Sequence, residues 1–295
     1  MAWSEGFIAA DWGTTNRRAY LIDADGRLAD RFEDDKGILA IPAGGFPAAV
    51  AEIRTLLGDR PMLLAGMVGS DRGWVEAPYV ACPAGFEDLA GHLAWAEPGR
   101  TAIVPGVCHS KGDAADVMRG EEVQILGALA AGMIGPDAII CHPGTHNKWI
   151  RLDAGRIAAF RTVMTGEIFN LLREHSILAE LLADTAEPGD AFEAGVSHGY
   201  EQDDLTAELF SMRARVLLGK ARREDMASYA SGLLIGADIR TGLRLVGDGE
   251  VVVMGRPELT RLYGAALAQV GRTAREADGE QAFLAGAKHL AELTE

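Results

Sequence analysis

The sequence has few cysteines and few basic residues for its length. Its 295 residues include three cysteines, Cys82, Cys108 and Cys141, which lie far apart and show no CxxC spacing. Such a set predicts reduced thiols rather than a disulfide framework. Lysine and arginine number 28 against 43 aspartate and glutamate residues, which gives a formal net charge of −15. This balance argues against a nucleic-acid partner, because the phosphate backbone requires a basic protein face.

Long apolar runs and the common nucleotide-binding motifs are also absent. No uncharged apolar stretch reaches the length of a membrane span, and the first residues, MAWSEGFIAADWG, show no basic segment ahead of an apolar run. We therefore expect a soluble cytoplasmic protein with no signal peptide and no membrane partner. Neither a GxxxxGK[ST] loop nor a GxGxxG segment after the first strand is present.

The residues that are abundant indicate a globular α/β protein. Apolar residues make up 48% of the chain, and 36 glycines accompany 11 prolines, as is typical of that class. A length of 295 residues exceeds the usual size of one hydrophobic core and suits two domains.

The chain contains an internal repeat. The segment IAADWGTTNRRAYLIDADGRLA near the start aligns with IICHPGTHNKWIRLDAGRIA near the middle, so that residues 13–17 lie over residues 144–148. Each copy begins with a short apolar run that predicts a buried strand, followed by a Gly-Thr turn, a second strand, an Asp/Gly turn and a third strand. The repeat therefore predicts two lobes that each present a tight loop.

Both predicted loops suit phosphate. Glycine permits close approach of the backbone, so that successive N–H groups can point at phosphate oxygens, and hydroxyl, amide and ammonium groups extend this donor set. The candidate phosphate-binding residues are Gly13, Thr14, Thr15, Asn16, Gly144, Thr145, His146, Asn147 and Lys148. Asp11 precedes the first loop where His142 precedes the second. Because Mg²⁺ is held by one or two carboxylates plus phosphates, we expect it on the Asp11 side.

A zinc site at His142 and His146 is the weaker alternative. The two histidines are four residues apart, but the intervening Pro-Gly-Thr turn is not helical. No third ligand lies near them in the sequence, which argues against zinc.

These loops resemble the two phosphate loops of the sugar kinase and actin superfamily, and the whole chain resembles the 2-dehydro-3-deoxygalactonokinase family. The resemblance rests on DWGTTN from Asp11, AGMVGSDRGWVEAPYV from Ala65, DVMRGEEVQILGAL from Asp116, HPGTHNKW from His142 and VVVMGRPELTRLYGAAL from Val251. It implies an α/β fold of two ribonuclease H-like (actin-like ATPase) lobes with a central ATP cleft. It also implies ATP- and magnesium-dependent phosphorylation of the 6-hydroxyl of 2-dehydro-3-deoxy-D-galactonate, in galactonate catabolism.

We expect the lobe boundary near residue 130, which gives an N-terminal lobe of residues 1–130 and a C-terminal lobe of residues 131–295. The resemblance implies that the last helix packs back on the first lobe. It also implies an adenosine segment where the strand Val251–Met254 runs into Gly255 and then into a helix. Residues 226–244 predict a packed helix, in which Gly232 and Gly236 mark close helix contacts.

A carboxylate must accept the proton of the attacking hydroxyl in such a reaction. The apolar spacing after Gly120 predicts a helix that begins there, with Glu121 and Glu122 in its first turn. Acidic residues are favoured at helix starts, which accounts for one of the two glutamates. Gly120-Glu121 is similar to the start of the hinge helix in related carbohydrate kinases, so the resemblance implies Glu121 as the general base. Asp116 is the alternative base, or else a helix N-cap.

The sugar acid is expected on the loop that carries Ser70, Asp71, Arg72 and Trp74. Carboxylates bind sugar hydroxyls, an arginine can hold the acid group with two hydrogen bonds, and an indole packs against carbon. Singly, Arg72 is equally a surface charge and Trp74 a core residue.

Further candidates for substrate contact lie elsewhere in the sequence. Arg18 and Arg119 are candidates for the substrate carboxylate, whereas Arg17 is equally consistent with surface charge. Thr165 and Glu167 belong to a segment that resembles one lining the family's cleft.

Two other functions stay open at this stage. One is a kinase of another sugar or sugar acid, such as 2-dehydro-3-deoxygluconate, and the other is a non-catalytic ATP-binding module. The acidic start of the predicted hinge helix favours transfer to a hydroxyl. The stereochemical preference, the arginine that binds the carboxylate and the oligomeric state, including a homo-oligomer, are left open.

Overall fold

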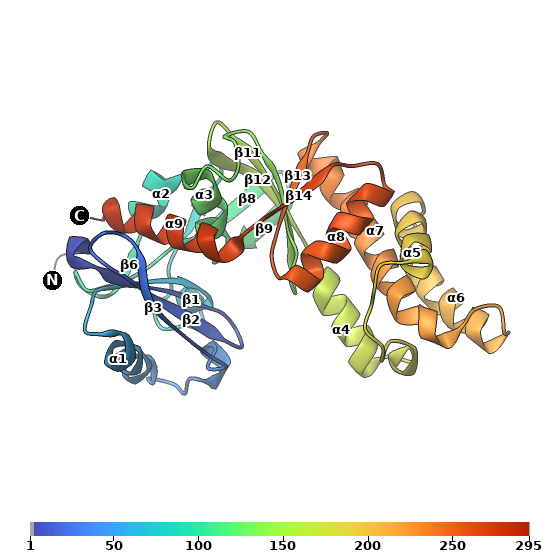
Figure 1. Ribbon diagram of the computed structural model, residues 1–295, viewed down its shortest axis with the longest axis horizontal. Coiled ribbons are helices and arrows are strands. Elements are labelled where there is room, and N and C mark those ends of the chain that lie inside the picture. Colours follow the sequence, from blue (N-terminus) through green and yellow to red (C-terminus); the bar gives the residue numbers. More distant parts are fainter. Residues whose placement is uncertain (1–2, 295) are drawn as a thin grey trace. The chain divides into compact units, whose positions relative to one another are not determined.

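The computed structural model describes residues 3–294, which fall into two compact units (Figure 1). Unit 1 comprises the chain up to Pro136, residues Leu152–Ala158 and the C-terminal segment from Gly279. Unit 2 comprises Asp137–Arg151 and Ala159–Asp278. These units are sets of mutual contacts, and the lobe boundary near residue 130 stays a prediction.

Unit 1 is built on a six-stranded sheet with the order β3-β2-β1-β4-β7-β6. The strands are β1 (Phe7–Trp12), β2 (Arg17–Ile22), β3 (Leu28–Asp34), β4 (Met62–Gly66), β6 (Ala94–Glu97) and β7 (Thr101–Ile103). A smaller sheet contains β5 (Tyr79–Ala81), β8 (Gly106–Lys111) and β9 (Ala114–Met118), and the helices are α1 (Phe46–Leu57), α2 (Phe86–Ala90), α3 (Glu121–Ala130) and α9 (Gly279–Glu292).

The alternation of side chains along β1 and β2 explains how this sheet is covered. Ile8 and Trp12 belong to one core cluster with Ile53 of α1, because alternate residues of a strand face the same side. On the other face, the ring of Tyr20 lies 5.8 Å from that of Phe283 in α9. The last helix therefore packs on unit 1, as the resemblance implies.

A five-stranded sheet with the order β12-β11-β10-β13-β14 belongs mainly to unit 2. Its strands are β10 (Ile139–His142), β11 (Asn147–Asp153), β12 (Arg156–Val163), β13 (Val251–Met254) and β14 (Ala274–Ala277). β10 pairs antiparallel with β11 and parallel with β13, as β1 pairs antiparallel with β2 and parallel with β4. The shared order confirms the predicted duplication and the α/β class of two ribonuclease H-like, actin-like ATPase units.

The helices of unit 2 are α4 (Thr165–His175), α5 (Asp190–Glu201), α6 (Leu205–Leu217), α7 (Met226–Val246) and α8 (Pro257–Gln269). The long helix α7 lies against α5. A Cβ atom placed on Gly232 would lie 2.1 Å from the carbonyl oxygen of Phe192, and one on Gly236 would lie 2.3 Å from that of Val196. The prediction that these glycines mark close helix contacts is thus confirmed.

Short 3₁₀ helices complete the chain: Trp3–Glu5, Ile38–Ala40, Met67–Gly69, Ala179–Leu181 and Arg223–Asp225. Within residues 3–294, none of the helices is both long and apolar enough to span a bilayer.

We expect Gly127→Ala to lower the Tm and Gly264→Ala to raise it slightly. A Cβ atom on Gly127 of α3 would lie 1.9 Å from the carbonyl oxygen of Ala282 in α9, so the two helices must separate, at a cost of about 1–3 kcal/mol. Gly264 of α8 has no described atom within 4 Å of its Cβ position, and alanine there gains about 0.5–1 kcal/mol of helix propensity. Thermal unfolding of both variants measures the difference. Equal shifts would contradict the close α3–α9 packing.

Candidate functional site

The first predicted phosphate loop is a tight turn between β1 and β2. The N–H of Gly13 donates to the carbonyl oxygen of Asn16 at 2.9 Å, which closes the turn and leaves Thr14, Thr15 and Asn16 exposed. Gly37 supports the turn from behind, because a Cβ atom there would lie 2.3 Å from the Thr14 backbone. The loop is thus fixed at its base and open to solvent at its tip.

Asp11 lies beside this loop and is paired with an arginine. Asp11 of β1 is the register partner of Arg18 of β2, and the Arg18 Nη2 donates to the Asp11 Oδ2 at 2.6 Å. Residues 3–294 contain no group of three or more metal-ligating side chains. The Asp11 carboxylate, however, fits a Mg²⁺ ion whose other ligands are waters and phosphate oxygens, because that ion is held by few protein ligands.

The neighbouring Arg17 is not a surface charge, so that interpretation is wrong. Its side chain is fully buried, with Nε 2.9 Å from the Asp34 Oδ1 and Nη2 2.7 Å from the Glu52 Oε2. Successive residues of a strand point to opposite faces, so Arg17 faces α1 while Arg18 faces Asp11.

The start of α3 packs onto the end of β4 close to Asp11. Gly120 is the N-cap of α3 with φ 105°, a conformation that favours glycine, and a Cβ atom on it would lie 3.2 Å from the Gly66 Cα. A Cβ atom on Gly66 would in turn lie 3.4 Å from the Asp11 Oδ1. The first helical turn of α3, with Glu121, therefore belongs to the same part of unit 1 as Asp11.

The two glutamates at this helix start differ in surroundings. Glu122 is fully buried, and its two carboxylate oxygens accept the Gly120 N–H at 2.9 and 2.7 Å. Glu121 is partly exposed, and its Oε2 accepts the Arg119 N–H at 3.2 Å. Glu122 therefore takes the capping role that the sequence left to one of the pair.

Asp116 lies on β9, where its Oδ1 accepts the N–H of Val117 at 2.9 Å. The interpretation of Asp116 as a helix N-cap is wrong, because the helix begins after Gly120 and the residues before it form a β-hairpin. Its alternative role as the base stays a prediction.

The stability of the fold should depend on the titration of Glu122. Burial, aided by the nearby Glu121 charge, raises the pKa of Glu122 from 4.5 to about 8. Between these values the folded state holds a proton that the unfolded state has lost, so the free energy of unfolding falls as the pH rises. Glu122→Gln removes this titration and keeps an acceptor for the Gly120 N–H. We expect its Tm to fall less than the wild-type Tm between about pH 5 and pH 8 in thermal unfolding; equal falls would contradict the assignment.

The loop predicted to bind the sugar acid is shaped by Ser70. Its hydroxyl donates to the Met67 carbonyl oxygen at 2.7 Å and accepts the Arg72 N–H at 3.3 Å. Asp71, Arg72 and Trp74 line a pocket of 480 Å³, whose other wall is the segment 41–47. The Trp74 ring stacks on Phe46 of this segment at 6.5 Å. The structure thus brings three of the predicted substrate residues to one pocket.

Arg119 supports the same loop from below. Its side chain is buried, with Nη2 2.8 Å from the Ala77 carbonyl oxygen and the guanidinium 4.4 Å from the centre of the Tyr79 ring. Its Nε and Nη1 have no hydrogen-bond partner in the described part of the chain. Neither Arg119 nor Arg18 is among the described residues that line the pocket.

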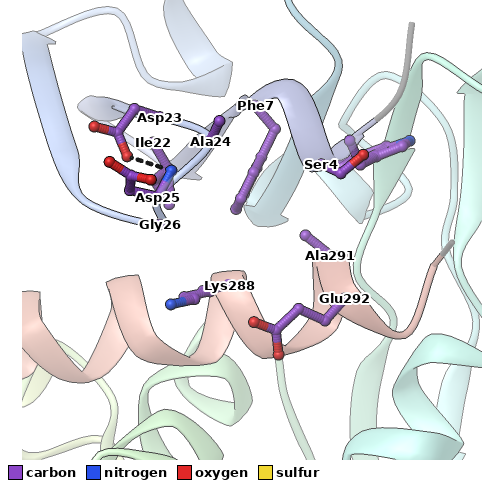
Figure 2. A pocket seen from close by; sticks show the side chains of 11 residues that line it. Ser4, Phe7, Ile22, Asp23, Ala24, Asp25, Gly26, Lys288, Ala291 and Glu292 are labelled. Carbon is purple, nitrogen blue, oxygen red and sulfur yellow. Dashed lines mark hydrogen bonds between the residues drawn. The ribbon is translucent and has the colours of Figure 1, made fainter.

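A second pocket in unit 1, of 280 Å³, lies near the opposite end of β1. Phe7 and Ile22 line it together with Asp23, Lys288 and Glu292, and Figure 2 shows the ammonium group of Lys288 opposite the turn at Gly26. Its described lining includes none of the residues predicted for the functional site.

The second predicted phosphate loop lies in unit 2 between β10 and β11. A Cβ atom on Gly255 would lie 3.1 Å from the carbonyl oxygen of Pro143, so the predicted adenosine segment packs against this loop. Lys148 is buried, and its Nζ donates to the carbonyl oxygen of His146 at 3.2 Å. The structure thus brings the loop, Lys148 and Gly255 together.

Thr165 and Glu167 lie at the start of α4, beside the second loop. The Glu167 N–H donates to the carbonyl oxygen of Thr145 at 3.0 Å, and the Glu167 carboxylate pairs with the imidazole of His146. A Cβ atom on Gly166 would lie 2.4 Å from the carbonyl oxygen of Gly144. These two predicted substrate residues therefore contact the second phosphate loop within unit 2, whereas Asp71, Arg72 and Trp74 belong to unit 1.

The sequence analysis missed Asp238 of α7. It is 1% exposed and accepts hydrogen bonds from four side chains, those of Asn147, Trp149, Thr165 and Tyr263. The available signal was a single carboxylate in the apolar stretch from Leu233 to Ile239.

The chain is similar to known proteins over nearly its whole length. Residues 11–290 match the family model described as "2-keto-3-deoxy-galactonokinase". The chain is 36% identical over 288 residues to the 2-dehydro-3-deoxygalactonokinase of Escherichia coli K12, and the alignment covers 97% of each protein. It is 37% identical to the "Probable 2-dehydro-3-deoxygalactonokinase DgoK1" of Rhizobium meliloti, covering 95% of this chain and 94% of that protein.

A crystal structure of a Sinorhizobium meliloti protein that bears the same enzyme name is also similar, with a TM-score of 0.90 and 34% identity. The match covers 97% of this chain and 98% of that one. The chain therefore belongs to the 2-keto-3-deoxy-galactonokinase family.

Proposed function

We propose that this protein is an ATP-dependent kinase that phosphorylates the 6-hydroxyl of 2-dehydro-3-deoxy-D-galactonate. The product is 2-dehydro-3-deoxy-6-phosphogalactonate. The observation that carries the proposal is the family match over residues 11–290, supported by 36% identity to the Escherichia coli enzyme across 97% of both chains. We expect this reaction to take place in the cytoplasm, as a step of galactonate catabolism.

In the proposed reaction the substrate's 6-hydroxyl oxygen attacks the γ-phosphorus of ATP. The bond from that phosphorus to the oxygen bridging the β- and γ-phosphates breaks, and ADP leaves. Phosphoryl transfer of this kind depends on positioning and on neutralisation of charge. The exposed turn after Asp11 and the second loop, with Lys148 behind it, would supply backbone N–H groups, hydroxyls and a cation to the phosphates. Gly255 would lie against the adenosine.

Glu121 would accept the proton of the attacking hydroxyl. Three observations support it over Glu122: it is partly exposed, it begins the helix next to Asp11, and Glu122 is buried with its oxygens on the Gly120 N–H. A Mg²⁺ ion held by Asp11 would neutralise phosphate charge.

The pocket lined by Asp71, Arg72 and Trp74 would hold the sugar acid, with Ser70 fixing the shape of its loop. Arg72 lines this pocket, which favours it as the partner of the substrate carboxylate. Arg18 and Arg119 remain alternatives, the second because two of its buried nitrogens have no partner in the described part of the chain.

A coupled assay of ADP release over a panel of sugar acids tests the function. We expect 2-dehydro-3-deoxygalactonate to give the highest kcat/KM and equimolar ADP and phosphorylated product. ATP binding with no stimulation by any sugar acid would overturn the proposal in favour of a non-catalytic module. A higher kcat/KM for 2-dehydro-3-deoxygluconate would move the assignment to that substrate.

A further inference from the structure

We propose that Asp238 is a positioning residue for the nucleotide: it holds the second phosphate loop in its binding conformation by joining that loop to α4 and α8. Asp238 lies within α7 and is separated from the loop by about 90 residues of sequence. The inference rests on the proposed kinase function, because it assigns ATP phosphates to the loop.

The hydrogen bonds of Asp238 come from three elements that frame the loop. Its Oδ2 accepts from the Asn147 Nδ2 at 2.8 Å, from the Thr165 hydroxyl at 2.6 Å and from the Tyr263 hydroxyl. Its Oδ1 accepts from the Trp149 Nε1 at 2.7 Å. Asn147 and Trp149 belong to β11, Thr165 begins α4 and Tyr263 belongs to α8.

Only an ionised carboxylate satisfies this set of donors. It has two oxygens with about four acceptor sites and no proton to donate, so it can accept all four bonds. Asparagine at this position would turn an N–H₂ group toward hydroxyl, amide or indole donors. Because Asp238 is 1% exposed, the unsatisfied donors would find little water to replace the carboxylate.

Two of the four donors are continuous with the loop itself. Asn147 directly follows His146, the last residue of the loop. Thr165 precedes Gly166, whose missing side chain lets the start of α4 approach the carbonyl oxygen of Gly144. A shift of either donor would therefore move the loop backbone, and with it the N–H groups that would face phosphate.

The protonation of Asp238 provides a second readout. Burial raises the pKa of Asp238 to about 6. The titratable groups that face it are Cys141 of β10 and Tyr263 of α8, and burial raises the pKa of both well above the ordinary range, so both stay neutral near pH 6. From β11 and α4 it meets Asn147, Trp149 and Thr165, which do not titrate. As the pH falls through about 6, Asp238 gains a proton and loses an acceptor.

The test is the Kd for magnesium ATP, measured by isothermal titration calorimetry without sugar acid. We expect Asp238→Asn to raise this Kd about tenfold and Tyr263→Phe about threefold, while the KM for the sugar acid stays unchanged. The matched control is Tyr229→Phe, which removes a buried tyrosine hydroxyl from another carboxylate in unit 2, the Glu208 Oε1 at 2.5 Å. It should leave the Kd unchanged.

The pH dependence of the Kd distinguishes positioning from a purely structural role. Below about pH 6 the wild-type Kd should rise more steeply than that of Asp238→Asn, whose side chain does not titrate. Variants that lower the Tm yet keep the wild-type Kd and pH profile would overturn the inference. If Asp238→Asn does not fold, Tyr263→Phe against Tyr229→Phe decides the question. A wild-type protein that binds no ATP would instead overturn the proposed function.

Discussion

Glu121→Gln is expected to lower kcat by about 10²–10⁴-fold while leaving the Kd for ATP unchanged. Glutamine keeps the size of the side chain and an oxygen for the Arg119 N–H, which Glu121 accepts at 3.2 Å, but it cannot take up the proton of the attacking hydroxyl. Steady-state kinetics with the sugar acid gives kcat, and calorimetry without the acceptor gives the Kd. A loss confined to kcat would support Glu121 as the base.

Two neighbouring carboxylates provide the controls for this experiment. Asp116→Asn changes the alternative base on β9, and Glu122→Gln changes the buried cap of the same helix. If Glu121 is the base, both controls should keep kcat within about tenfold of the wild-type value, since neither contacts the reacting hydroxyl. Near-normal turnover of Glu121→Gln together with an inactive Asp116→Asn would move the base to Asp116.

Much of the fold could be predicted because the information is local and repeated. The apolar runs, the Gly-Thr turns and the Asp/Gly turns occur in the same order in both copies, and the two sheets show the same pairing at β1 and β10. The helix after Gly120 and the strand before Gly255 were likewise set by spacing and glycine placement. Each of these features depends on residues close together in the sequence.

The features that escaped prediction depend on contacts between distant segments. Asp238 receives hydrogen bonds from residues up to 91 positions away, and Arg17 is buried by Asp34 and Glu52 of other elements. A composition pattern cannot show that a charge has such partners. Likewise, nothing in Gly120-Glu121-Glu122 tells which glutamate turns inward; the burial of Glu122 decides that.

Asp11→Asn is expected to lower kcat/KM for ATP by about 10²–10³-fold and to raise the magnesium concentration needed for half-maximal activity. The amide cannot replace a carboxylate as a ligand of Mg²⁺, and it also weakens the pair with Arg18, whose Nη2 lies 2.6 Å from the Asp11 Oδ2. A magnesium titration at saturating sugar acid measures both effects.

Asp34→Asn is the matched control, because Asp34 forms the corresponding pair with Arg17 in the same sheet and both carboxylates are 18% exposed. The two variants remove equal charge from equally exposed aspartate–arginine pairs, so a general effect of charge or stability should appear in both. Asp34 is bound to a buried arginine that faces α1, and its loss should lower the Tm without changing the magnesium dependence. A magnesium dependence changed equally in both variants would contradict the assignment of Asp11. A change confined to Asp11→Asn would place the ion on the side of the first loop, where only this copy of the repeat carries a carboxylate.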